Sequence, residues 1–283
     1  MFICERRFQL WEHLDSVNPK TIGFVPTMGN LHDGHLALVR EALDQCEHVI
    51  ASIFVNPIQF GAHEDFHEYP RTLPEDLAAL DEAGCHAVYV PTMDEIYPSG
   101  ELSITKVSVP KMSEVLCGKD RPGHFDGVTT IVCKLLNIVQ PGAAYFGEKD
   151  WQQFTIISQM VMDLDFTLDT YSVPTQREPD GLAMSSRNSR LSASERKLAP
   201  LLYKNLCDVR KQIVAGKTDF RALEKEAMEK LKDEGFKPIY VSIYDEDELT
   251  EMNPKDFGEP RIFGAAFLGN VRLIDNVPVN PNP

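Results

Sequence analysis

The feature of the sequence that most restricts its fold is an alternation between short β-branched runs and segments with helical periodicity. Between the runs at residues 22–26 and 48–55, four apolar residues recur at spacings of three and four, which predicts one face of a helix: Leu36, Val39, Leu43 and Cys46. Further runs of strand character lie at residues 87–90, 143–146 and 166–173. Strands that alternate with helices are typical of a parallel sheet with crossover helices. The first two thirds of the chain are therefore expected to fold as an α/β unit.

Two other helices are indicated by their ends or by their composition. Thr72-Leu-Pro-Glu75 has the pattern of a capping box with proline near the first helical position, and Gly84 lies where that helix is expected to end. Residues 127–139 are too apolar for a surface helix. This segment is expected to pack against the sheet or against another subunit.

The sequence changes character beyond about residue 176, after a segment that contains proline and glycine, residues 173–181. We expect residues 1–175 to form one domain and residues 176–283 a smaller α+β domain. Leu268-Gly-Asn-Val271 predicts a tight hairpin turn between two strands. The expected elements of this part are helices at residues 192–214 and 219–233 and strands at residues 238–244, 262–268 and 272–274.

Composition argues against several classes of protein. The formal net charge of −15 disfavours a surface that binds nucleic acid, because affinity for phosphate backbones depends on clustered Lys and Arg. No apolar segment is long enough for a membrane span, and none has the form of a secretion signal. The six cysteines form no C-x-x-C pair, which disfavours a disulfide framework and a zinc knuckle. A cytoplasmic location is expected.

The segment His32-Asp-Gly-His35 follows a predicted strand and begins a predicted helix. Unpaired backbone N–H groups and the helix dipole favour an anion at such a position, so this is a candidate site for phosphate. Imidazoles there can donate hydrogen bonds to phosphate oxygens and stabilise charge on a leaving group. Gly34 would let a ligand approach the backbone. In the alternative reading, which stays open, one histidine caps the turn and the other lies on the surface.

A second histidine motif, His63-Glu-Asp-Phe-His67, matches the helical zinc signature H-E-x-x-H. That signature requires a sustained helix, whereas Gly61 and Pro70 leave room for fewer than three turns without apolar periodicity. We therefore expect a solvated acidic loop here rather than a metalloprotease site.

Two further segments carry polar groups that suit a phosphorylated ligand. Lys149 and Asp150 follow the run at 143–146, and the carboxyl ends of parallel strands face the ligand crevice. Ser185, Ser186 and Arg187 lie in a polar loop that can donate several hydrogen bonds to a triphosphate and close on it. Taken separately, the first segment is equally an exposed helix start, and the second a plain approach to the next helix.

The motifs taken together are similar to those of one family, in the same order along the chain. They are PTMGNLHDGH, FVNPIQF, YPRT, RPGHFDGVTTIV, FGEKDWQQ, DGLAMSSRN and, near the end, LIDN. With them the chain resembles the pantoate–β-alanine ligases, the pantothenate synthetases of the class I synthetase-like nucleotidylyltransferase superfamily. The resemblance implies a Rossmann-like doubly wound parallel sheet with a smaller C-terminal α+β lid domain. It also implies a homodimer.

The resemblance implies an ATP-dependent condensation of (R)-pantoate with β-alanine through a pantoyl adenylate, releasing pyrophosphate and AMP. The implied catalytic residues are His35, His32, Lys149 and Arg187. Gln59 would bind pantoate and β-alanine, and Gln153 would bind pantoate. The implied ATP-binding residues are Met28, Gly29, Asn30, Leu31, His32, Asp33, Gly34, His35, Gly147, Glu148, Lys149, Asp150, Gln176, Met184, Ser185, Ser186 and Arg187.

Some assignments stay open under this resemblance. Gln176 would lie near the adenine through its backbone, and Arg121 and His124 either flank the pantoate site or hold a loop. Mg²⁺ is implied as a cofactor, but Glu75 stands where some members of the family have the first of two aspartates, so its protein ligands are not assigned. A nucleotidylyltransferase acting on a phosphate ester and an inactive nucleotide-binding module are the competing readings.

Overall fold

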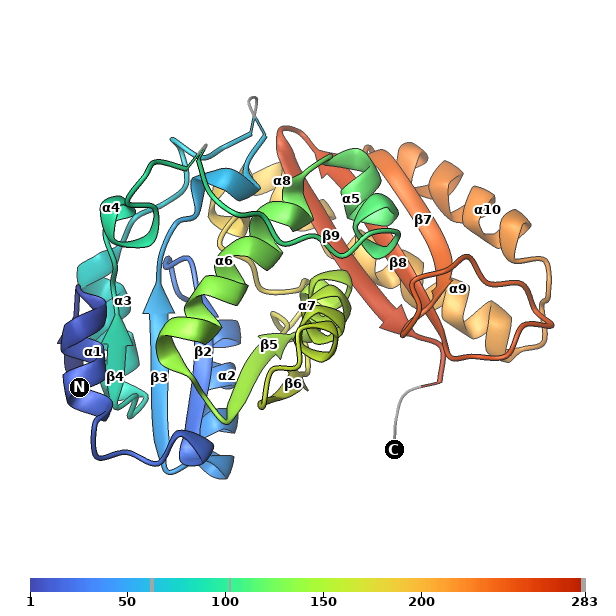
Figure 1. Cartoon of the computed structure of the whole chain (residues 1–283). Helices are drawn as coiled ribbons and strands as arrows, with labels where there is room; N and C mark the ends of the chain where they lie inside the picture. Colours follow the sequence, from blue (N-terminus) through green and yellow to red (C-terminus); the bar gives the residue numbers. More distant parts are fainter. Residues whose placement is uncertain (62–63, 102, 281–283) are drawn as a thin grey trace.

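A computed structural model describes residues 1–61, 64–101 and 103–280 of the chain. Its larger part is built on a six-stranded sheet in which all neighbouring strands are parallel, in the order β1-β4-β3-β2-β5-β6 (Figure 1). The strands are β1 (Phe2–Cys4), β2 (Ile22–Thr27), β3 (His48–Ile53), β4 (Ala87–Tyr89), β5 (Ala143–Gly147) and β6 (Asp169–Val173).

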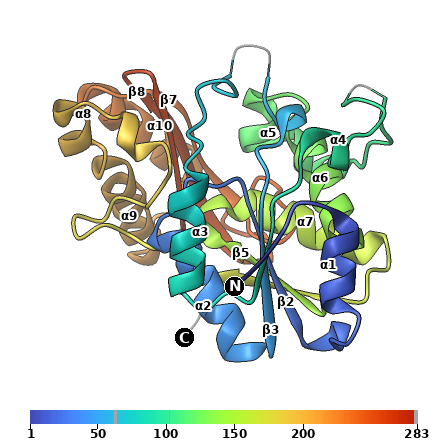
Figure 2. The same ribbon diagram turned by 90° about the vertical axis from the view of Figure 1, so that its left-hand side faces the viewer.

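Helices cover both faces of this sheet, as Figure 2 shows along its edge. One apolar core lies between the sheet and α2 (Asp33–Gln45) and α3 (Leu73–Glu82). The other lies between the opposite face and α1 (Arg7–Leu14), α6 (His124–Val139) and α7 (Trp151–Asp163). The doubly wound parallel α/β fold that the sequence predicts is confirmed. Two short helices, α4 (Met93–Ile96) and α5 (Leu116–Asp120), lie in the connections.

The C-terminal part contains an antiparallel sheet of β7 (Lys237–Asp245), β8 (Pro260–Leu268) and β9 (Val271–Pro278). Leu268 pairs with Val271 across the predicted two-residue turn, where Gly269 has a positive φ of 57°. One face of the sheet packs on α9 (Leu201–Val214) and α10 (Phe220–Asp233). Residues of the other face, among them Tyr244 and Phe263, belong to the same apolar core as α6 and α7.

The structure corrects the predicted helix at residues 192–214, which is two helices. The first, α8 (Ala193–Leu198), ends at Ala199, and α9 begins after Pro200. Pro200 lacks the N–H that would continue the helical hydrogen bonds, so the helix is interrupted there although Ala199 and Pro200 both keep helical backbone angles. The charged periodicity on both sides concealed this break.

Two other predictions are corrected in detail, and one strand was not predicted. The strand expected from residue 166 begins only at Asp169, because residues 164–166 close the end of α7 with three backbone hydrogen bonds. Thr72 precedes α3 without a side-chain capping bond to its backbone; its hydroxyl donates to Asp76 Oδ1 at 3.2 Å instead. Gly84, with φ of 87°, follows α3 as predicted. The three-residue edge strand β1 was not predicted, since it is too short to show alternation.

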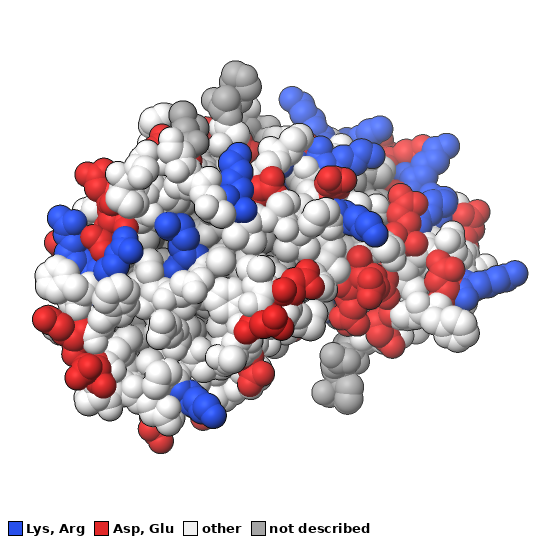
Figure 3. All heavy atoms as spheres, in the orientation of Figure 1, with Lys and Arg blue, Asp and Glu red and all other residues white. Residues whose placement is uncertain are grey.

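The acidic excess is not spread evenly over the surface. On the face in Figure 3, acidic and basic side chains lie beside one another over the C-terminal part, whereas the surface around α6 carries few charges. An anionic ligand would therefore need a few local cations rather than a basic surface.

Most apolar residues of α6 are buried within the chain. Of the two roles expected for the apolar segment 127–139, packing against the sheet is therefore the one observed.

Gly127 in α6 lies against the short 3₁₀ turn Pro57–Gln59. A Cβ atom there would come within 2.4 Å of the Ile58 carbonyl oxygen and 2.6 Å of the Gln59 Cα atom. Because the contacts are backbone atoms, neither side can yield without moving the turn. The close packing of α6 against the turn thereby fixes the position of the Gln59 backbone, from which its side chain projects.

We predict that Gly127→Ala lowers the free energy of unfolding by about 1–3 kcal/mol, the usual cost of overpacking a core. Urea unfolding of the variant and the wild type measures it. Gly147→Ala is the matched control, because a Cβ there meets no atom within 4 Å and φ is −81°. Equal destabilisation by both changes would contradict the packing argument.

Candidate active site

The candidate site lies where the order of the strands reverses. From β2 the chain crosses to β3 on one side, and β5 later pairs with β2 on the other side. Ligands bind in α/β sheets at the carboxyl ends of strands beside such a switch point. Here a cavity of about 250 Å³ opens beyond the ends of β2 and β5.

Most of the predicted site residues line this cavity. They are Met28, His32, Gly34, His35, Gln59, Arg121, His124, Gly147, Lys149, Asp150, Gln153, Gln176, Met184, Ser185, Ser186 and Arg187. Five others do not line it: Gly29, Asn30, Leu31, Asp33 and Glu148. Of these, Asp33 is exposed in the first turn of α2, and Glu148 accepts a hydrogen bond from Ser172 Oγ at 3.3 Å.

The two histidines at the start of α2 are held by backbone hydrogen bonds. His32 is the N-cap, and its Nδ1 accepts from the Gly34 N–H at 3.1 Å; His35 Nδ1 accepts from the His32 N–H at 3.3 Å. A neutral imidazole that accepts at Nδ1 carries its proton at Nε2. Both rings are thus fixed as Nε2–H donors. The alternative from the sequence was that one histidine caps the turn and the other lies on the surface. His32 does cap the helix, but both histidines line the cavity.

The pKa values of both histidines are lowered. Burial lowers the pKa of His32 to about 4, with a further contribution from the Lys149 charge, and burial together with His32 lowers the pKa of His35 to about 3. The ring centroids are 4.1 Å apart, so two positive charges there would also repel each other. At neutral pH the site therefore presents two neutral donors.

Gly34 lines the cavity and also leaves space for a neighbouring side chain. A Cβ atom at this position would lie 2.8 Å from the His32 ring atoms Cε1 and Nδ1. The residue for which Gly34 leaves space is therefore His32 itself, whose ring folds back over the helix start.

Asp76 holds the loop between β2 and α2. Its carboxylate accepts from the Asn30 N–H at 2.9 Å and from the Leu31 N–H at 2.8 Å, and the side chain is buried. Gly29 and Asn30 both have positive φ values, 80° and 49°, which turns these N–H groups toward one carboxylate. Both oxygens of Asp76 are used by the protein, so this carboxylate does not face the cavity as a metal ligand.

The side chain of Gln59 belongs to a buried polar chain that the sequence only partly indicated. Asn56 Nδ2 donates to Gln59 Oε1 at 3.0 Å and to the Gly127 carbonyl at 3.1 Å, while Tyr97 OH donates to Asn56 Oδ1 at 2.7 Å. Gln59 Nε2 then points toward Met28 Sδ, 3.2 Å away. Asn56 lines the cavity and was missed, although it stands inside the FVNPIQF motif.

The acidic segment at residues 64–67 is not the solvated loop that the sequence suggested. Glu64 accepts two hydrogen bonds from the Arg121 guanidinium, at 2.6 and 2.5 Å. Asp65 accepts two from Arg187, both at 3.0 Å, and also pairs with Arg190. No helix includes residues 64–67. His63, the first histidine of the motif, lies outside the described residues.

These ion pairs shift the pKa values of their members. Burial opposes ionisation of Asp65, but its hydrogen bonds and the charge of Arg187 hold its pKa below the usual range. Burial likewise disfavours the charged form of Arg187, and the Asp65 carboxylate raises its pKa. Arg187 is thus fully charged in a site where only 29% of its side-chain surface is accessible.

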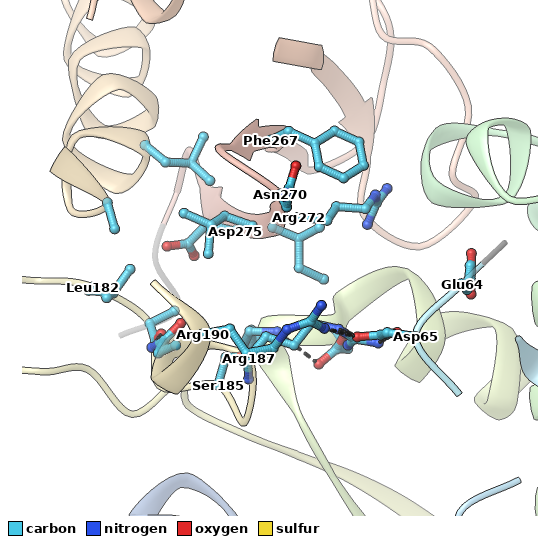
Figure 4. A pocket seen from close by; sticks show the side chains of 18 of the residues that line it. Glu64, Asp65, Leu182, Ser185, Arg187, Arg190, Phe267, Asn270, Arg272 and Asp275 are labelled. Carbon is cyan, nitrogen blue, oxygen red and sulfur yellow. Dashed lines mark hydrogen bonds and ion pairs between the residues drawn. The ribbon is translucent and has the colours of Figure 1, made fainter. Parts of the chain in front are cut away.

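The predicted loop at residues 184–187 contacts the helix start directly. Ser186 Oγ donates to the Asn30 carbonyl at 3.0 Å, and Asn30 Nδ2 donates to the Ser186 carbonyl at 3.3 Å. A second cavity of about 500 Å³ continues from this loop toward β8 and β9. Figure 4 shows Arg187 and Arg190 directed toward Asp65 on one side, with Arg272, Asn270 and Phe267 on the opposite wall.

The described residues offer no ready-made metal centre. Among them, no three His, Cys, Asp or Glu side chains are grouped so that they could hold a metal ion. The side chain of Asp150 is 45% exposed, lines the cavity and lies 3.5 Å from Lys149 Nζ.

Among the residues that the structure describes, no helix has the length and apolar character of a membrane span.

Comparison with known proteins matches this chain to one family along nearly its whole length. The family model described as pantoate-beta-alanine ligase matches residues 3–278. The chain is 52% identical to the pantothenate synthetase of Idiomarina loihiensis over 91% of each chain, and 50% identical to that of Chromohalobacter salexigens over 96% of each.

Solved structures give the same result. The fold matches the Thermus thermophilus pantothenate synthetase with a TM-score of 0.92 at 41% identity, over 99% of this chain and 100% of that one. It matches the Francisella tularensis pantoate-beta-alanine ligase, complexed with beta-gamma ATP and β-alanine, with a TM-score of 0.83 at 35% identity, over 99% and 98%.

The chain belongs to the pantoate–β-alanine ligase family. The predicted family, the predicted fold class and the predicted ligase activity are confirmed by these matches. The metalloprotease reading of residues 63–67 is excluded by the same finding together with the absence of a helix across residues 64–67.

The histidines make the stability of this ligase depend on pH. In the unfolded chain His35 takes up a proton near pH 6.5, whereas in the folded chain its pKa is about 3. The unfolded state therefore binds more protons between these values, so the stabilising effect of neutral His35 is complete above about pH 6.5 and is lost as the pH falls toward 3.

We predict that the unfolding free energy of the wild type falls more steeply from pH 7 to pH 4.5 than that of His35→Asn. Urea unfolding at several pH values measures both slopes. His67→Asn, which removes an exposed histidine, is expected to keep the wild-type slope. Parallel slopes for wild type and His35→Asn would show that His35 titrates alike in both states.

Proposed function

We propose that this chain joins (R)-pantoate to β-alanine at the cavity beyond β2 and β5, with MgATP as the third substrate. The observation that carries the proposal is the pair of neutral imidazoles at the start of α2, in one cavity with Lys149 and Arg187. Neither Nε2–H has a hydrogen-bond partner among the described residues, so both can donate to a ligand. The related Francisella enzyme was solved with beta-gamma ATP and β-alanine.

In the first step, a carboxylate oxygen of pantoate attacks the α-phosphorus of ATP, and the bond to the pyrophosphate oxygen breaks. His32 and His35 donate from Nε2 to the phosphates, whose negative charge grows on the departing group. Lys149 neutralises the transferred phosphoryl group, and Arg187 binds the leaving pyrophosphate. The donors are already fixed, so little reorganisation accompanies the reaction.

Pantoate lies between Gln59 and Gln153 in this proposal. Gln59 Oε1 is held by Asn56, and one N–H of its Nε2 faces Met28 Sδ, which leaves the other N–H as a donor toward the cavity. Neutral amide donors suit a pocket that first holds a carboxylate and then the uncharged acyl carbonyl of the mixed anhydride formed from it. Asn56 is a further candidate contact, since it lines the same cavity.

In the second step, the ammonium group of β-alanine first releases a proton to solvent. The resulting amine attacks the carbonyl carbon of pantoyl adenylate, AMP leaves with the C–O bond electrons, and the nitrogen releases a second proton to solvent to give the amide. Gln59 would bind β-alanine beside pantoate.

The nucleotide would be held by the seventeen residues assigned from the sequence. Five of them do not line the cavity and would act through their backbone or by supporting the loop: Gly29, Asn30, Leu31, Asp33 and Glu148.

Arg121 and His124 line the cavity and support the turn that carries Gln59. His124 contacts the Gln59 carbonyl through Nδ1 at 2.8 Å and Arg121 through Nε2 at 2.9 Å. A carbonyl only accepts and a guanidinium only donates, so His124 is a neutral Nδ1–H donor. Burial and the Arg121 charge lower its pKa to about 4, in agreement with this form. Both residues position the turn that carries Gln59.

Magnesium enters with ATP as part of the substrate in this proposal. Asp76 is engaged with backbone N–H groups, and the described residues form no cluster of side chains that could hold a metal ion, so the phosphates would supply most ligands.

The domain division after residue 175 is also proposed, with residues 176–283 as the lid domain.

We also propose that the protein forms a homodimer and that it is located in the cytoplasm. The apolar helix α6 no longer supports dimerisation, because its residues are mostly buried within the chain. A sedimentation mass equal to one chain would overturn the dimer. All six cysteines are free thiols, which agrees with a reducing compartment.

We predict pantoate-dependent exchange of labelled pyrophosphate into ATP without β-alanine. His35→Ala is expected to lower this exchange by about 10²–10³-fold, the usual cost of removing one transition-state donor. Exchange with a phosphate-ester substrate instead of pantoate would favour the nucleotidylyltransferase reading. ATP binding without exchange by folded wild-type protein would favour the inactive module.

We predict that Asp65→Asn tightens ATP binding by about twofold to tenfold, because ATP then no longer competes with a carboxylate for Arg187. Isothermal titration calorimetry measures the dissociation constant. Glu68→Gln is the control, since Glu68 is 74% exposed and pairs with Arg190. Weaker ATP binding in Asp65→Asn would show that Asp65 orients Arg187 for the nucleotide.

A further inference from the structure

We propose that Asp275 and Asn276, adjacent residues of β9, are positioning residues that hold the two cation-bearing segments of the site in register. These are the turn that carries Lys149 and the loop that carries Arg187. The inference rests on the proposed function. It gives a physical role to the LIDN motif, residues 273–276, which the proposed reaction leaves unassigned.

Asn276 binds the turn that carries Lys149. Its Nδ2 donates to the Glu148 carbonyl at 2.8 Å and to the Lys149 carbonyl at 3.0 Å. This turn is a single 3₁₀ segment, Glu148–Asp150, between β5 and α7. Such a short segment satisfies few of its own carbonyls, so partners from outside must fix it. The Asn276 amide is the partner of two successive carbonyls.

The orientation of the Asn276 amide is itself determined. Arg261 donates from a terminal nitrogen to Asn276 Oδ1 at 2.7 Å, which leaves only the amide N–H groups for the turn. Arg261 is immobilised in turn, because its guanidinium lies 3.5 Å from the Trp151 ring centroid and its Nε donates to Glu246 at 2.8 Å. Only 5% of the Asn276 surface is exposed.

Asp275 binds the base of the other segment. Its carboxylate accepts two hydrogen bonds from Arg177, at 2.7 and 2.8 Å, and is buried. Arg177 also lies 3.5 Å from the Tyr203 ring centroid and donates to the Gly181 carbonyl at 3.1 Å. The guanidinium is therefore fixed on one face by the Tyr203 ring and at its edge by Asp275 and the Gly181 carbonyl.

Arg177 transmits this position to the loop with Ser185 and Arg187. Arg177 pairs with Ala183 in an isolated β-bridge, and Met184 N–H donates to the Gln176 carbonyl at 2.9 Å. The loop thus leaves a short two-stranded ribbon whose base is attached to β9. Figure 4 shows Asp275 and Arg272 on the wall opposite Ser185, Arg187 and Arg190.

Side chains of successive residues in a strand point to opposite sides. Asp275 and Asn276 use this geometry to reach both segments beyond the point where the sheet pairing of β5 and β6 ends, at Gly147 and Val173. One strand of the C-terminal sheet therefore contributes to the separation of Lys149 from Arg187, beside the contacts of the loop with Asp65 and Asn30. A phosphate chain that must contact both cations depends on that separation.

The test uses pantoate-dependent pyrophosphate exchange with Asn276→Ala and the near-isosteric Asn276→Asp, which cannot donate to the two carbonyls. Both are expected to lower kcat by about 10- to 100-fold while KM for ATP stays within about twofold, since the transferred phosphoryl group loses a placed lysine. Asp275→Asn, which weakens the hold on Arg177, is expected to raise KM for ATP more than it lowers kcat.

The matched control is Asn280→Ala, which removes an exposed asparagine bonded to Glu259 near the end of β9. It is expected to leave kcat and KM unchanged. A second readout does not need activity: hydrogen exchange of residues 147–153 is expected to quicken in both Asn276 variants and not in Asn280→Ala.

Wild-type kcat with unchanged hydrogen exchange in the Asn276 variants would overturn the positioning role. So would a general loss of melting temperature with equal effects on kcat and KM, which would mark these residues as structural only. If wild type and Asn280→Ala both lack exchange of pyrophosphate, the proposed function fails instead. The hydrogen-exchange comparison then still decides whether β9 holds the Lys149 turn.

Discussion

The site depends on the pairing of β2 with β5, two strands that are remote in sequence and parallel in the sheet. Gly23 pairs with Ala143 and Phe24 with Ala144. Counting three residues beyond the second pair reaches Thr27 and Gly147, the last residues of both strands. The helix start with its two histidines and the turn with Lys149 therefore begin at the same height of the sheet. A shift in this register would separate them, whatever their local sequences.

Within this arrangement, two arginines of the site are paired with carboxylates of the protein instead of being exposed to solvent. The chain has a net charge of −15, yet its site must bind a triphosphate and a carboxylate. Arg121 and Arg187 are each held by a carboxylate of the segment 64–65, which offsets the cost of burying a cation before the ligand arrives. The histidines solve the same problem differently: burial keeps them neutral, so they donate hydrogen bonds without adding charge.

The sequence allowed the α/β class and most elements to be predicted because their signals are local. The period of apolar residues and the glycine after α3 are properties of short segments. The break at Pro200 and the late start of β6 were missed because the residues around them keep apolar or charged patterns typical of the longer element. The edge strand β1 is stabilised by its partner β4, and no local signal indicates such pairing.

The same distinction applies to the site. His32, His35 and Lys149 could be predicted because they stand in recognisable positions after strands. Asn56 and Asp76 could not be assigned, since each acts on groups that only the fold brings near: the Gln59 amide and the N–H groups of Asn30 and Leu31. The acidic residues Glu64 and Asp65 were misread for the same reason, because an isolated sequence does not show which arginines face them.

The loop with Arg187 presents a problem that the parallel sheet alone does not solve. Carboxyl ends of neighbouring strands place the histidines and Lys149, but the loop follows β6, the edge strand, and continues into the C-terminal part. An edge strand leaves the connection after it without a neighbour on one side. The loop is supported instead by Asn30 of the helix start and, through Arg177, by β9. The C-terminal sheet is thus part of the framework of the site, since it shares an apolar core with α6 and α7 and meets the turn that carries Lys149 through Asn276.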